Sequence, residues 1–124
     1  MKNYTDANNF FKMKKKTGAV TVPVETDMLL VYEDRSTYGL TLGGTPIIKY
    51  YRDGTIMLIE DDCGTAILRS RLNKYSPDCM KVTQRKFCLY VKFYDVTVPL
   101  NGTLIFNPAK QEICNDPTID MFFN

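Results

Sequence analysis

The sequence predicts an α+β domain that is mainly β: a curled antiparallel sheet or small barrel with one short central helix and a second helix near the N-terminus. Short runs rich in β-branched and aromatic residues recur between turns that contain Gly, Pro or Asn, as in antiparallel sheets. A helical period replaces this pattern in the middle of the chain. With 124 residues, 44% of them hydrophobic, we expect residues 1–124 to form a single domain.

The N-terminal segment predicts a short helix followed by an edge strand. Thr5 is a suitable N-cap for this helix, and the lysine run at 14–16 followed by Gly18 is typical of a helix end. Apolar residues then alternate with other residues over 20–24, as they do in a strand. Pro23 lies inside this run, and because proline has no N–H to donate, we expect this strand at a sheet edge.

Glycine-containing turns divide the next part of the chain into strands. Gly43-Gly44 predicts one turn, and Asp53-Gly54 predicts the clearest hairpin of the chain. Asp-Gly suits a type I′ turn, in which both central residues take a positive φ. The strands are expected at 28–33, 38–42, 47–52 and 55–60.

A short amphipathic helix is predicted after these strands. Leu68, Leu72 and Tyr75 are spaced as i, i+4 and i+7, and Pro77 marks the helix end. The apolar face of the helix is expected to pack on the sheet. Its polar face is basic.

The second half of the chain returns to the strand pattern. A long strand is expected at 87–94, and a second hairpin is expected around Asn101-Gly102, between strands at 96–100 and 103–106. The closing residues Met121-Phe122-Phe123 are apolar. We expect this tail to dock on the domain or on a second copy, which would make the protein a homo-oligomer.

The residue inventory argues against an enzyme and against a metal site. The chain has no His, so the common general base and the Ser-His and Cys-His pairs are missing. Its four scattered Cys lack zinc-ligand spacing and are expected to be small buried hydrophobes. The acidic run at 60–62 sits at a strand end, where neighbouring side chains point to opposite faces. No cofactor is expected.

The charge distribution points to an anionic ligand. Residues 66–92 carry seven basic residues against one acidic residue. A helix face with guanidinium and ammonium groups, close to tyrosines on a hairpin, can hold a nucleotide by charge-assisted hydrogen bonds and stacking. The alternative is that Arg71 and Asn73 anchor the helix to neighbouring loops. The candidate ligand-binding residues are Arg69, Arg71, Asn73, Lys74, Tyr50 and Tyr51.

Basic and aromatic residues also interleave over 85–94, as in sheets that bind single-stranded nucleic acid. The same mixture is ordinary on one face of a strand. The net charge is only +2, so long nucleic acid is the less expected partner.

The middle of the chain resembles a family of small uncharacterised proteins of tailed bacteriophages. The resemblance covers 28–77 and rests on Gly44-Thr45, Ile47-Ile48, Tyr50, Asp53-Gly54-Thr55-Ile56, Leu58, Thr65 and Arg71-Leu72-Asn73. It implies a viral or prophage origin. It implies no particular activity, because none is assigned to the family as a whole.

Two functions follow as expectations. One is a non-enzymatic phage accessory protein that binds and inhibits or sequesters a host component, either a defence protein or a signalling nucleotide. The other is a structural or morphogenesis protein, or a nucleic-acid-binding module. The sequence has no apolar run of about 18 residues and no signal-peptide pattern, so no membrane partner is expected and the location is expected to be the host cytoplasm.

Overall fold

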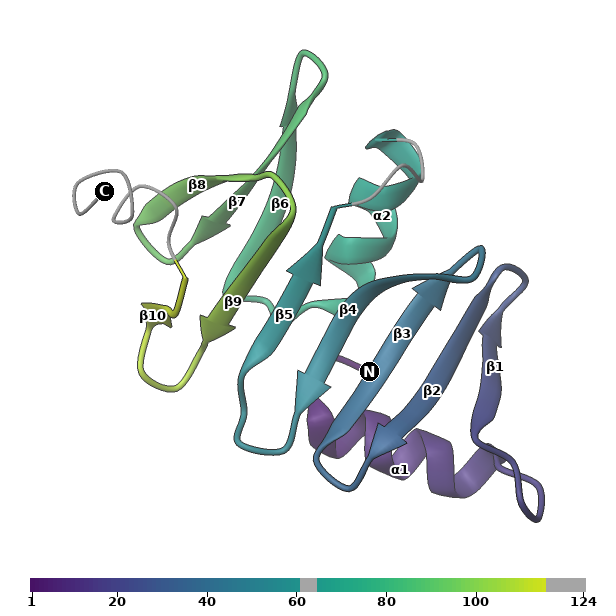
Figure 1. Ribbon diagram of the computed structural model, residues 1–124. Helices are drawn as coiled ribbons and strands as arrows, with labels where there is room; N and C mark the ends of the chain where they lie inside the picture. Colours follow the sequence, from purple (N-terminus) through teal and green to yellow (C-terminus); the bar gives the residue numbers. More distant parts are fainter. Residues whose placement is uncertain (61–64, 116–124) are drawn as a thin grey trace.

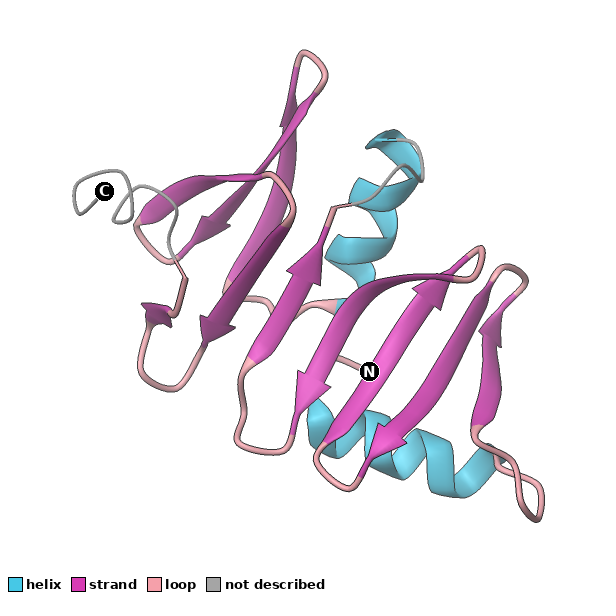
Figure 2. Ribbon diagram, in the orientation of Figure 1, coloured by secondary structure: helices cyan, strands magenta, loops and turns pink. Residues whose placement is uncertain are grey.

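The computed structural model describes residues 1–60 and 65–115, apart from the side chain of Thr65. Strands predominate over helices, so the predicted α+β class with mainly β content is confirmed (Figure 2). The predicted docking of the tail at 121–123 lies outside the described residues, as do Asp61 and Asp62. The elements are α1 (Tyr4–Lys14), β1 (Thr21–Glu25), β2 (Met28–Asp34), β3 (Thr37–Leu42), β4 (Thr45–Tyr51), β5 (Ile56–Ile59), α2 (Thr65–Tyr75), β6 (Met80–Arg85), β7 (Cys88–Phe93), β8 (Val96–Leu100), β9 (Thr103–Asn107) and β10 (Glu112–Ile113).

Within the described residues, the strands form two antiparallel sheets that do not close into a barrel (Figure 1). The first sheet has seven strands in the order β1-β2-β3-β4-β5-β9-β10, and the second has three in the order β6-β7-β8. Of the two predicted forms, a curled sheet or a small barrel, the described strands therefore form open sheets. The prediction that the Pro23 strand lies at an edge is confirmed, because β1 pairs with β2 alone.

The turns at Gly43-Gly44 and Asp53-Gly54 form where the sequence predicts them, but the predicted type of the second turn is wrong. Gly43 and Gly44 both have positive φ, 58° and 83°, as the tight β3–β4 turn requires. The hairpin around Asp53-Gly54 is confirmed because β4 pairs with β5, but the type I′ prediction is wrong. Only Gly54 has a positive φ, of 96°, and its N–H donates to the carbonyl of Tyr51 at 3.0 Å. The loop is longer than two residues, so a single left-handed glycine completes it.

Helix α1 packs across the strands of the first sheet near the end where the β2–β3 and β4–β5 turns lie (Figure 1). Asn3 is its N-cap, since its side-chain oxygen accepts a hydrogen bond from the N–H of Asp6 at 2.8 Å. The predicted cap, Thr5, lies inside the helix. Asn is as effective as any residue at this position, and the helix therefore begins before Thr5. Phe11 is buried and contacts Tyr38 of β3, with ring centroids 5.4 Å apart.

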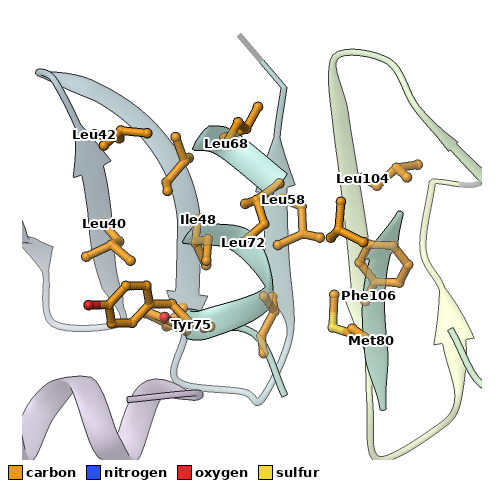
Figure 3. Packing of buried hydrophobic residues seen from close by; sticks show 14 of the residues in the cluster. Leu40, Leu42, Ile48, Leu58, Leu68, Leu72, Tyr75, Met80, Leu104 and Phe106 are labelled. Carbon is orange, nitrogen blue, oxygen red and sulfur yellow. Dashed lines mark hydrogen bonds between the residues drawn. The ribbon is translucent and has the colours of Figure 1, made fainter. Parts of the chain in front are cut away.

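Helix α2 fills the space between the two sheets (Figure 3). Leu68, Leu72 and Tyr75 are all buried, which confirms the predicted apolar face. The hydroxyl of Tyr50 in β4 donates to the carbonyl of Tyr75 at 2.6 Å, so the last turn of the helix is tied to the first sheet. Both helices lie on the same face of that sheet, because Tyr38 and Tyr50 are cross-strand partners.

The predicted hairpin around Asn101-Gly102 is wrong. Strand β8 pairs with β7, whereas β9 pairs with β5 and β10, so this link carries the chain from one sheet to the other. Gly102 has a φ of 87°, which allows the sharp change of direction. The two sheets then pack through Phe93 and Phe106, whose ring centroids are 5.0 Å apart.

The cysteines also differ from expectation. Cys88 and Cys114 are exposed, so they are not small buried hydrophobes, whereas Cys79 is half-buried and packs against the core. Cys88 lies on the outward-pointing side of β7, where the strand alternation leaves side chains in solvent. The fourth, Cys63, lies outside the described residues.

Candidate functional site

The structure uses two of the predicted ligand-binding residues to join helix α2 to the sheets. Tyr50 is fully buried and its hydroxyl is bonded to Tyr75. The side-chain amide of Asn73 accepts from the N–H of Val82 at 2.7 Å and donates to the carbonyl of Val82 at 2.8 Å. Asn73 therefore anchors the helix, as the alternative expected, but its partner is strand β6 and not a neighbouring loop. The two hydrogen bonds satisfy the N–H and the carbonyl of Val82, which point away from the sheet because β6 is an edge strand.

Two further predicted residues face a carboxylate of the chain itself. Lys74 Nζ lies 3.2 Å from Glu25 Oε2, and Arg71 Nε lies 3.9 Å from the same oxygen. Tyr75 also donates its hydroxyl to Glu25. The hydrogen bond from Tyr75 and the two cations lower the pKa of Glu25. These cations are therefore partly neutralised within the fold.

The remaining predicted residues lie apart from this cluster. Arg69 is half-buried on α2. Tyr51 follows Tyr50 in β4 and so points to the opposite face of the sheet. It lines a hollow with Ser36, Arg52 and Asp53. The structure thus does not bring the six predicted residues together, and their role in binding stays a prediction.

A different site lies between α1 and the adjacent end of the first sheet. We call this hollow, which has a volume of about 570 Å³, the α1 pocket. That volume falls within the range of roughly 300–1,000 Å³ common for small-molecule sites. The pocket is lined by Tyr4, Asn8, Phe11, Lys12, Lys15, Gly18, Ala19, Val20, Tyr32, Arg35, Tyr38 and Arg52.

The charged groups of the α1 pocket all have one sign. Its cations are Lys12, Lys15, Arg35 and Arg52, and no acidic residue of the described chain lines it. All four cations are exposed. Ion pairs within the described residues involve other basic residues than these four. The pocket therefore offers donors and positive charge to an anion.

Aromatic rings form the wall of the pocket. Tyr38 contacts Tyr4, Phe11 and Tyr32, with centroid separations of 5.4, 5.4 and 5.6 Å. Phe11 stacks on Tyr32 at 5.8 Å. Burial is the main cause of the raised pKa of Tyr38, followed by the neighbouring Tyr4 and Tyr32. Its hydroxyl stays protonated at neutral pH and donates to Asn8 Oδ1 at 2.7 Å.

Hydrogen bonds to the Asp34 carboxylate stabilise the turn that carries Arg35. Asp34 Oδ1 accepts from both the N–H and the hydroxyl of Ser36, each at 2.8 Å. The carbonyl of Arg35 accepts from the Tyr4 hydroxyl at 2.9 Å, which ties the turn to α1. The Arg52 N–H donates to the Ser36 carbonyl at 2.8 Å, so the two arginine-bearing turns are joined.

The turn that carries Arg52 is organised in the same way. Asp53 Oδ1 accepts from the N–H of Thr55 at 2.9 Å and from its hydroxyl at 2.6 Å. These bonds lower the pKa of Asp53, as the corresponding bonds from Ser36 lower that of Asp34. Both carboxylates are thus engaged in local turns, which fix the backbone from which the arginines extend.

The sequence held only faint signals for this site. The lysine run at 14–16, which includes Lys15, is fully accounted for by the end of a helix, and no sequence pattern singles out Lys12, Arg35 or Arg52. The signal that could have found the pocket is the placing of Tyr32 and Tyr38 around Arg35. These tyrosines are cross-strand partners in the β2–β3 hairpin, so both rings lie on one face beside the arginine.

Comparisons with protein-family models, curated proteins and solved structures found no match for this chain. The resemblance to phage proteins therefore stays a prediction. Of the helices described, neither combines the length and apolar character needed to cross a membrane. In the part of the chain that the structure describes, no group of three or more Cys, Asp or Glu residues is arranged to hold a metal ion.

Proposed function

We propose that the protein is a non-enzymatic accessory protein that sequesters a small anionic ligand with an aromatic ring, of the nucleotide class, in the α1 pocket. One observation carries this proposal: four cations and four aromatic rings line one hollow that no described acid lines. Phosphates suit the guanidinium and ammonium groups, and a base suits the exposed parts of the rings.

The rings and cations are placed to act on one ligand. Tyr4 and Tyr32 are half-buried, so part of each ring faces the pocket. Lys12 extends from α1 and Lys15 is its C-cap, whereas Arg35 and Arg52 extend from turns held together by the Arg52–Ser36 bond. A ligand between the helix and these turns meets cations from both sides. Such pre-organisation lowers the entropic cost of binding.

The lining groups support capture without chemical conversion. The pocket offers donors, cations and rings, but its described lining has neither a carboxylate nor a thiol for general-base or nucleophilic catalysis. A bound nucleotide is therefore expected to be recovered unchanged. Sequestration of a host signalling nucleotide in the cytoplasm is the role that fits a small phage accessory protein.

Native mass spectrometry of protein purified from bacterial cells, with the absorbance ratio at 260 and 280 nm, tests the proposal. The chain lacks Trp, so a bound base raises this ratio visibly. Calorimetry with a panel of purine mononucleotides then gives the affinity. Arg35→Ala and Arg52→Ala are each expected to weaken binding roughly ten- to a hundredfold, because a charge-assisted hydrogen bond contributes about 1.5–3 kcal/mol.

Arg69→Ala is the matched control, since it removes the same charge from helix α2. If Arg69→Ala abolishes binding and Arg35→Ala leaves it unchanged, the ligand binds at the site predicted from sequence and the α1 pocket assignment is wrong. If none of the nucleotides binds and the purified protein carries no extra mass, the ligand class is wrong. Host-protein pull-downs would then test the defence-protein alternative.

The structural or morphogenesis alternative receives less support from the strand edges. β1 carries Pro23 and a register shift between Pro23 and Glu25, and β10 has two residues. β8 carries Pro99, and the outward groups of Val82 in β6 are occupied by Asn73. These features block the addition of further strands. Open assembly through the described edges is thus disfavoured.

A further inference from the structure

The outer face of the three-stranded sheet is a second surface that combines basic residues with aromatic rings. Its inward residues, such as Leu89, Val91 and Phe93, are buried. The outward residues of β6 and β7 include Lys81, Arg85, Cys88, Tyr90 and Lys92. Strands β6, β7 and β8 contain no acidic residue at all. We call this surface the outer face.

Two lysines on the outer face oppose each other directly. Lys81 of β6 and Lys92 of β7 are cross-strand partners, and both are exposed. Like charges in this position destabilise a sheet. Neither lysine takes part in an ion pair within the described residues. The fold thus keeps a repulsive pair that a bound anion would relieve.

Rings lie next to these charges. Tyr90 is centrally placed, with Thr83 and Pro99 as its cross-strand partners on either side. The guanidinium of Arg85 lies over the Tyr90 ring, 5.4 Å from its centroid. Phe87, in the β6–β7 turn, is 90% exposed. A fully exposed phenyl ring beside a cationic face is a stacking surface for a planar group.

A hollow of about 240 Å³ connects the two rings. Phe87 and Tyr90 both line it, together with Pro99, Asn101 and Glu60. It is smaller than the roughly 300–1,000 Å³ of sites that bury a whole ligand, and therefore suits one group of a longer ligand. Glu60 is the acidic residue that lines this hollow, and carboxylates can accept a hydrogen bond from the amino group of a base.

We propose that the outer face binds single-stranded nucleic acid, with phosphates along Lys81, Lys92 and Arg85 and one base stacked between Phe87 and Tyr90. The charge pattern selects a polyanion. The rings favour a nucleic acid over an acidic peptide, because every base has a face that stacks on an aromatic side chain. A single strand is favoured over a duplex, whose bases are already stacked on one another. This binding is independent of the α1 pocket.

Fluorescence anisotropy with a labelled single-stranded thymidine oligonucleotide of roughly a dozen nucleotides tests the proposal. Binding is expected to weaken with salt, and the logarithmic slope should become shallower by about 1.4 in Lys81→Ala/Lys92→Ala, since each phosphate contact on a single strand contributes about 0.7. This variant removes a like-charge pair and should fold at least as well as the wild type.

Tyr90 and two lysines outside both sites provide the controls. Tyr90→Ala should weaken binding roughly tenfold to a hundredfold, whereas Tyr90→Phe, which keeps the ring, should bind almost as the wild type. Lys14→Ala/Lys110→Ala removes the same charge from exposed lysines that line neither the α1 pocket nor the outer-face hollow, and should leave the affinity unchanged. The proposal is overturned by a salt slope that Lys81→Ala/Lys92→Ala does not change. Equal affinity for a duplex of the same length, or for a poly-glutamate peptide, overturns it as well.

Discussion

Replacing Asn73 by Ala separates its structural contribution from the ligand-binding role that the sequence suggests. The change removes two hydrogen bonds to the backbone of Val82, at 2.7 and 2.8 Å. Each contributes about 1 kcal/mol net, so their loss costs about 2 kcal/mol. Ala is the better helix former by roughly 0.6 kcal/mol, which offsets part of this loss. The expected net decrease in the free energy of unfolding is about 1.5 kcal/mol.

The assay is thermal and urea unfolding followed by circular dichroism. For a domain of this size, about 1.5 kcal/mol corresponds to a decrease in Tm of roughly 6 °C. Asn9→Ala is the matched control, because Asn9 is exposed in α1 and its side chain makes no hydrogen bond that the described structure shows. It gains the same helix propensity without losing a bond, so it should be neutral or slightly stabilising.

The difference between these two variants measures the Asn73–Val82 bonds directly. If Asn73→Ala and Asn9→Ala unfold at the same urea concentration, the bonds contribute nothing and the anchoring role of Asn73 is refuted. If Asn73→Ala loses ligand affinity while its stability is unchanged, Asn73 binds the ligand directly, as the sequence predicted. Asn73→Asp keeps the acceptor for the Val82 N–H but loses the donor to its carbonyl, and should also be destabilised.

Three further predictions concern the same core and turns. Tyr50→Phe removes the buried hydrogen bond to Tyr75 and should lower the free energy of unfolding by about 1–2 kcal/mol in urea; an unchanged midpoint would contradict this. Gly54→Ala forces a Cβ into a φ of 96° and should cost about 1 kcal/mol although no atom lies near the added Cβ, while Gly54→Asn should cost less. Glu25 has a lowered pKa in the folded state, so its stabilising effect is complete above its unfolded pKa of about 4.3 and disappears as the pH falls through the lower folded value. The stability difference between wild type and Glu25→Gln should therefore shrink on acidification, and a difference that is constant with pH would exclude the ionic contribution.

Local patterns predicted much of the fold because the interactions behind them are local. The spacing of Leu68, Leu72 and Tyr75 identifies one helix face, and that face is buried as expected. The β4–β5 hairpin forms where Asp53-Gly54 supplies a left-handed residue. Pairing between neighbouring strands and amphipathic packing can both be recognised within a short window of sequence.

The pairing of distant strands could not be recognised in the same way. Asn101-Gly102 has the sequence of a hairpin turn, but β9 pairs with β5, nearly fifty residues earlier. This pairing comes together with the packing of Phe106 against Phe93 across the two sheets, and no local pattern contains either contact. The α1 pocket could not be recognised for the same reason, because its rings and cations come from α1 and its C-cap, two turns and the two strands β2 and β3.

The charge distribution along the sequence does not reveal which basic residues stay unpaired after the chain folds. The basic segment at 66–92 suggested an anionic ligand, and the fold divides that segment into two parts. Arg71 and Lys74 lie on α2 beside Glu25, a residue more than forty positions earlier in sequence. The basic residues of β6 and β7 lie on an outer face whose strands contain no acid. A count of charges along the sequence treats the basic residues of α2 and those of β6 and β7 as equally available to an anion. An anion, however, responds to the field that remains after the fold has paired its own charges, and that field is strongest where no internal carboxylate opposes it.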